Sequence, residues 1–146
     1  IEYQALIEEY GKLLKESLLN DEVSEGIYQM KNIFPNTFNA IISGSDQKEL
    51  KWLFNKKNIS YIFNFGIFGS PKSKFDIFDK IFSELDGNEK ILFLGDSKYD
   101  YLVSTKYKMD FIFISEWTEF KNWEIFIKEN NIKSFKNISE FLNSYM

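Results

Sequence analysis

The sequence has 146 residues, of which 44% are hydrophobic and 18% aromatic, and its formal net charge is −4. This apolar content is enough for the core of one domain, which excludes a disordered or fibrous chain. Lysines are scattered between acidic residues, so no basic surface suits a nucleic-acid partner. The chain has no cysteine and no histidine, which excludes disulfides, the usual zinc sites, thiol nucleophiles and histidine-dependent triads.

The apolar runs of the sequence are short. Runs such as residues 91–94 and 111–114 fall far below the roughly 20 residues that a membrane span needs. The first residues do not show the basic region and apolar stretch of a signal peptide. We therefore expect a cytoplasmic protein with no membrane partner.

The first part of the chain predicts helices. Apolar residues within 1–19 recur at helical spacing between charged ones, which predicts an amphipathic helix. A second, short helix is expected from about Ser24, with Ile27 and Met30 buried. Pro35 ends its pattern.

The hydrophobic period then changes, and short apolar strands alternate with helices. Strands are expected over residues 38–42, once or twice within 59–68, and over 90–94 and 111–114. Helices are expected around residues 50–54, 75–85, 99–106, 123–128 and 139–143, with Ser45 or Asp46 capping the first. Strands that are apolar on both faces and alternate with helices are typical of a parallel sheet covered on both sides. The predicted fold class is therefore α/β.

Polar residues follow several of these strands. In open parallel sheets ligands bind at the carboxyl ends of the strands. Ser43 and Asp96 each follow an expected strand, and Lys74 opens the helix after another. Connections in a parallel sheet bring successive strand ends to one edge, so we expect these three residues to converge.

The strongest motif is the run Gly-Asp-Ser-Lys-Tyr-Asp over residues 95–100. A glycine allows a tight turn after the strand, Asp96 lies at the strand end, and Asp100 follows one helical turn later. Two carboxylates so placed suit Mg²⁺, which prefers oxygen ligands and keeps several waters. The alternative is a plain strand-to-helix turn whose aspartate caps the helix. We expect Asp96 and Asp100 to bind Mg²⁺.

Ser43 and Lys74 suggest that this edge of the sheet binds an anion. Ser43, followed by Gly-Ser, could hold a phosphoryl oxygen with its hydroxyl and the amides of the next helix, although taken alone it fits an ordinary helix cap better. A lysine at a helix start opposes the helix dipole and is better tolerated beside a bound anion. Lys74 is favoured on this ground, and Lys72 remains a close competitor.

In order and spacing these residues resemble the haloacid dehalogenase (HAD) superfamily of phosphohydrolases, over roughly residues 26–114. Ser43 resembles the second motif of that family, Lys74 the third, and residues 95–100 the fourth, which is the most specific. The resemblance implies a HAD-like core over 26–146, with a three-layer Rossmann-like parallel sheet. It implies that residues 1–25 are the remnant of a helical cap domain.

The resemblance also implies roles for the site residues. Ser43 would hold the transferring phosphoryl group and Lys74 would neutralise the phosphoaspartate. Asp96 would bind Mg²⁺, with Asp100 beside it as a ligand or in support. The activity implied is that of a Mg²⁺-dependent phosphatase acting on a small phosphorylated metabolite through an aspartyl-phosphate intermediate.

One part of the family pattern is missing. The first motif, Asp-x-Asp, supplies the nucleophile and a general acid or base, yet no two of the eight aspartates here are separated by a single residue. We expect the nucleophile to lie upstream, or on a second chain that completes the sheet, and this chain alone to be inactive. The alternatives are a catalytically inactive HAD-like phosphate-binding or metal-binding module and a phosphomutase. A receiver-type signalling domain fits less well, because its acidic pair should precede the hydroxyl and the lysine.

Overall fold

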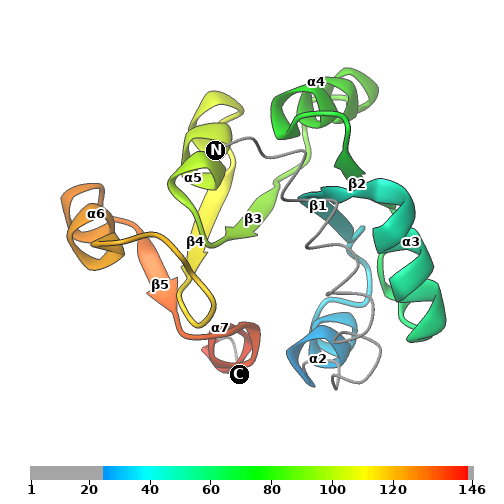
Figure 1. Cartoon of the computed structure of the whole chain (residues 1–146), viewed down its shortest axis with the longest axis horizontal. Helices are drawn as coiled ribbons and strands as arrows, with labels where there is room; N and C mark the ends of the chain where they lie inside the picture. The colour runs from blue at the N-terminus through cyan, green and yellow to red at the C-terminus, as the bar shows by residue number, and fades with distance from the viewer. Residues whose placement is uncertain (1–24, 145–146) are drawn as a thin grey trace. The chain divides into compact units, whose positions relative to one another are not determined.

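The computed structural model describes residues 25–144, which fall into two compact units, one up to Lys80 and the other from Ile81 onward. The helix predicted over 1–19 and nearly all of the predicted cap segment 1–25 lie outside the described residues. Each unit has its own sheet and helices (Figure 1). The predicted α/β class is confirmed, and all the strand pairs are parallel.

The first unit is built on two strands. Its elements in chain order are α2 (Glu25–Ile33), β1 (Ala40–Asp46), α3 (Gln47–Lys56), the short 3-10 turn η1 (Ser60–Ile62), β2 (Gly66–Ser70) and α4 (Lys74–Glu84), which runs on into the second unit. The two strands pair in parallel, with Ile42 opposite Phe68, and α3 packs against both of them. The register is irregular between Ile42 and Asp46, at the end of β1 that leads into α3.

The core of this unit forms around the segment between α3 and β2. Its buried members are Ile59, Ile62, Phe63 and Ile67. Residues packed against them come from α2, β1 and α3, namely Ile27, Met30, Ile41, Leu50 and Phe54. The predicted packing of the apolar face of α2 is thus confirmed, although its side chains are half-buried rather than fully covered.

The second unit is a three-stranded parallel sheet in the order β3, β4, β5. Its elements are β3 (Leu92–Gly95), α5 (Lys98–Lys106), β4 (Asp110–Ile114), α6 (Trp123–Glu129), β5 (Lys133–Phe135) and α7 (Ile138–Asn143). Alternate residues of β4 meet the covering helices. The Phe111 ring lies edge-on to Tyr101 of α5, and the Phe113 ring stacks on Trp123 of α6.

The strands differ from the sequence prediction in three places. The first extends through the polar residues up to Asp46 instead of ending at Ile42. The second runs past the expected limit at residue 68 to include Gly69 and Ser70, because the backbone stays extended until the proline that follows. The third is β5, which was not predicted because its three residues include a single apolar one.

The expected single sheet is also not what the described residues form. They form two sheets, in which β1 has β2 as its strand neighbour and β3 has β4. None of the described helices is long and apolar enough to cross a membrane.

Candidate functional site

The turn between β3 and α5 is organised by Ser97. Its side chain caps α5 by accepting a hydrogen bond from the backbone N–H of Asp100, with an oxygen-to-nitrogen distance of 3.1 Å. The capping role that we considered for Asp96 therefore belongs to its neighbour. The cap does not explain why a carboxylate stands at position 96, where the side chain is exposed.

Asp100 lies behind this turn and supports it. It is 2% exposed, and its Oδ2 accepts a hydrogen bond of 3.1 Å from the backbone N–H of Asp96. A carboxylate acceptor makes this bond stronger than one between neutral groups. Of the two predicted metal ligands, Asp96 is thus the exposed one, and Asp100 holds the backbone that carries it.

Gly95 is needed for space in this arrangement. A Cβ atom at this position would lie 2.6 Å from the Cβ of Asp100 and 2.7 Å from its Oδ2. The backbone dihedral does not require glycine, since the described glycines with positive φ are Gly66 and Gly87. We attributed this glycine to a tight turn, and the structure gives close approach of the Asp100 side chain as the reason.

Asp96 is the exposed carboxylate of this turn. Among the described residues no three acidic side chains gather into a group that could hold a metal ion. Mg²⁺ in phosphoryl-transfer sites is usually held by one or two carboxylates together with waters and substrate phosphates. An exposed Asp96 at a strand end is a suitable carboxylate for such a site.

Thr118 also belongs to this turn, and the sequence analysis missed it. The residue lies in the loop between β4 and α6, and its hydroxyl donates a hydrogen bond to the backbone carbonyl of Asp96. Thr118 lies in the loop after the apolar strand β4, and a hydroxyl residue within such a loop is the sequence signal that could have found it.

Ser43 lies at the irregular end of β1. Its hydroxyl accepts a hydrogen bond of 3.1 Å from the backbone N–H of Ser45. The cap of α3 is Asp46, whose Oδ1 accepts from the N–H of Glu49 at 3.0 Å, so Ser43 is not a helix cap. A serine hydroxyl that accepts one hydrogen bond can still donate its own hydrogen to a ligand oxygen.

The irregular end of β1 is closely packed on one side and open on the other. A Cβ on Gly44 would meet nothing within 4 Å, whereas a Cβ on Gly69 of β2 would collide with the carbonyl oxygen of Ser45. The N–H of Gly69 also donates to Oε1 of Gln47, at 3.1 Å. The irregular end of β1 therefore lies close against the end of β2, and there is open space beside Gly44.

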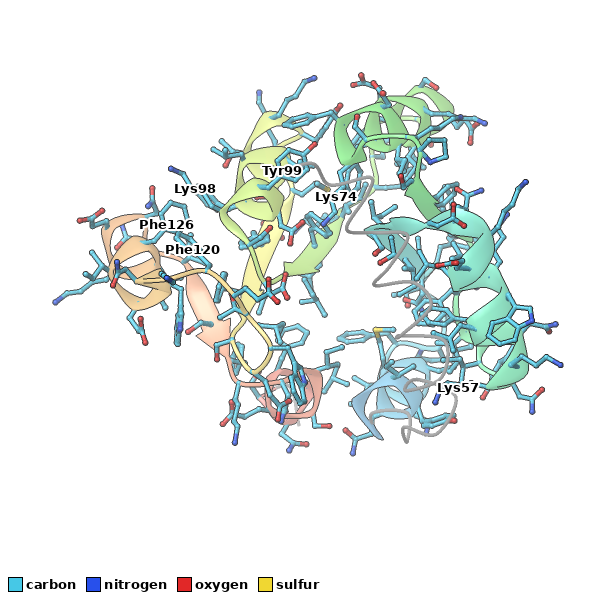
Figure 2. The ribbon with its side chains drawn as sticks, viewed as in Figure 1. Lys57, Lys74, Lys98, Tyr99, Phe120 and Phe126 are labelled. Atoms are coloured by element: carbon cyan, nitrogen blue, oxygen red, sulfur yellow. The ribbon has the colours of Figure 1, made fainter. Side chains whose placement is uncertain are left out.

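Lys74, labelled in Figure 2, is the first residue of α4. The helix start is stabilised by Ser73, whose hydroxyl accepts from the N–H of Asp76 at 3.0 Å. Lys74 is half-buried and Lys72 is exposed. Lys74 is thus the less exposed of the two lysines, and the preference for it as an anion ligand stays a prediction.

The four predicted residues lie at carboxyl ends of strands in their own units. Ser43 lies within β1 rather than after it, just beyond the regular pairing that stops at Ile42, and Lys74 follows the end of the partner strand β2. Asp96 and Asp100 follow the end of β3. The structure thus brings the predicted residues to strand ends in two pairs, and the convergence of the pairs stays a prediction.

Comparison of the chain with protein-family models, with curated proteins and with solved structures finds no match.

Proposed function

We propose that this chain is the core of a HAD-type, Mg²⁺-dependent phosphatase that acts on a small phosphorylated metabolite. The observation that carries the proposal is the turn over residues 95–100. Its exposed Asp96 follows a strand, and its buried Asp100 holds the backbone of Asp96 one helical turn away. An exposed carboxylate whose backbone is held by a second, buried carboxylate is compatible with a metal ligand and a residue that supports it.

Each of the four residues has a separate role in the proposed phosphoryl transfer. In the proposal, Ser43 donates its hydroxyl hydrogen to an oxygen of the transferring group, and the ammonium of Lys74 balances the charge of the phosphoaspartate. Asp96 holds the metal, and Asp100 holds Asp96. When bound, Mg²⁺ offsets the charge between a carboxylate and a phosphate that would otherwise repel each other.

The nucleophile is proposed to come from a strand outside this sequence. In the fold that the sequence resembles, the Asp-x-Asp motif ends a strand that lies between the counterparts of β1 and β3. Among the described residues these two strands have one strand neighbour each, which is compatible with such an insertion. An upstream segment or a second chain would supply it. We therefore expect no phosphatase activity from this chain alone.

A second candidate is a catalytically inactive module that binds phosphate or metal. The observation that favours it is the absence of an Asp-x-Asp pair from the sequence. A phosphomutase would share every residue discussed above and also requires the missing nucleophile. Phosphatase activity on addition of a segment that carries Asp-x-Asp would distinguish the enzyme from the binding module.

The metal site is tested with Asp96→Asn. We expect the wild-type chain to bind Mg²⁺ weakly, and the variant to lose most of this binding, because an amide oxygen has no full negative charge to offer. Calorimetric or NMR titration measures both. Asp110→Asn is the matched control, since Asp110 is an exposed aspartate at the amino end of β4. Equal binding by Asp96→Asn and the wild type would contradict the proposal.

A further inference from the structure

The loop that follows β4 reaches the Asp96 turn through one side chain. The hydroxyl of Thr118 donates to the carbonyl oxygen of Asp96 at 2.5 Å and accepts from the backbone N–H of Phe120 at 3.1 Å. A threonine hydroxyl has one hydrogen to donate. Here that hydrogen is directed at Asp96.

The hydrogen bonds to Asp96 hold its Cα atom from both sides. Its N–H belongs to the planar peptide shared with Gly95, and its C=O belongs to the planar peptide shared with Ser97. Oδ2 of Asp100 binds the first peptide, and the hydroxyl of Thr118 binds the second. With both planes held, rotation about the backbone bonds of Asp96 is restricted, and the direction of its Cα–Cβ bond is restricted with it.

The loop that carries Thr118 is itself anchored at both ends. Its first residues, Ser115 and Glu116, donate backbone hydrogen bonds of 3.0 and 2.8 Å to carbonyls of β5 and of the residue after it. At the other end the Phe120 ring packs against the ring of Phe126 on α6, with 5.2 Å between the ring centroids. Both residues are labelled in Figure 2. The threonine hydroxyl is therefore presented by a segment fixed to two other elements.

We infer that Thr118 is a positioning residue that orients the Asp96 carboxylate toward Mg²⁺. The inference rests on the proposed function, which makes Asp96 the metal ligand. Substitution of a group that orients a metal ligand typically lowers metal affinity by about 10- to 100-fold. Loss of the hydroxyl leaves Asp96 in place and frees one of its two peptide planes.

The test compares two substitutions of Thr118 in the full chain. Thr118→Val has nearly the same shape without the hydroxyl, and we expect it to weaken Mg²⁺ binding by about 10-fold. Thr118→Ser keeps the hydroxyl and should restore most of the affinity. NMR or calorimetric titration with Mg²⁺ measures the dissociation constants, and thermal melting of each variant checks its fold.

Thr105→Val is the matched control for the same change of side chain. The hydroxyl of Thr105 donates to the carbonyl oxygen of Tyr101 at 3.0 Å on the exposed side of α5, so its loss should leave Mg²⁺ affinity unchanged. Equal affinity in Thr118→Val and the wild type overturns the inference and leaves the metal site intact. Weak binding in both Thr118→Val and Thr118→Ser also overturns it, because the hydroxyl is then not the cause. If Mg²⁺ binding by the wild-type chain does not depend on Asp96, the inference and the proposed function are overturned together.

Discussion

At the scale of single residues, the sequence located the 95–100 turn but not the reason for each residue in it. Residue type and spacing placed Asp96 at a strand end and Asp100 one turn later, and the structure agrees. Spacing does not reveal which of two adjacent polar residues caps the helix, and the cap is Ser97. Nor does it reveal contacts between distant segments, such as the one between Thr118 and Asp96.

Gly95→Ala should destabilise the chain, because the new Cβ would lie 2.6 Å from the Cβ of the buried Asp100. Forcing extra volume into a packed site typically costs about 1 to 3 kcal/mol. Urea unfolding measures the loss. Gly44→Ala serves as the control, since its Cβ would meet nothing within 4 Å, and surface changes of this kind usually stay within about 0.5 kcal/mol. Similar losses for the two variants would mean that Asp100 does not occupy the space beside Gly95.

At the scale of elements, apolar runs located four of the five strands and left their ends uncertain. Residues 41–42 and 112–113 are apolar and gave strong signals. At the polar end of β1, Asp46 lies opposite Ser70 of β2 beyond an irregular stretch, and pairing of this kind is not visible in one segment alone. The short β5 is held by its pairing to β4, so hydrophobic periodicity could not have found it.

The ends of β1 and β2 are predicted to share one anion. Inorganic phosphate should raise the free energy of unfolding, by about 2.7 kcal/mol at a hundred times its dissociation constant. Ser43→Ala and Lys74→Ala should both reduce this stabilisation, because each removes a donor to the anion. Thermal melting with and without phosphate measures the effect.

Lys72→Ala provides the comparison for the lysine assignment. Lys72 is exposed, lies two residues before Lys74 and carries the same charge, so general electrostatic attraction would treat the two residues alike. We expect the phosphate effect to survive this substitution. Loss of the effect in Lys72→Ala, with retention in Lys74→Ala, would transfer the role to Lys72.

At the scale of the whole molecule, the sequence predicted one sheet and the described residues form two. Hydrophobic periodicity within one segment predicts whether that segment is a strand or a helix, and the predicted elements lie close to their observed residue ranges. How many strands join one sheet depends on pairing between segments far apart in sequence. A segment that carries the proposed Asp-x-Asp strand would change that pairing, and this sequence has no such motif.

The proposed function predicts that phosphate and Mg²⁺ raise each other's affinity. Reciprocity follows from linkage, and typical couplings are about 5-fold or more. The physical reason is that a metal held by Asp96 would offset negative charge on the phosphate bound by Ser43 and Lys74. Calorimetric titration of phosphate with and without Mg²⁺ measures the coupling, and Asp96→Asn should abolish it. Mg²⁺ also associates with phosphate in solution without the protein, and titration of the Asp96→Asn variant measures that contribution. If phosphate binds equally well at every Mg²⁺ concentration while Asp96 still binds the metal, the two sites are independent, and the inactive binding module becomes the better account of this chain.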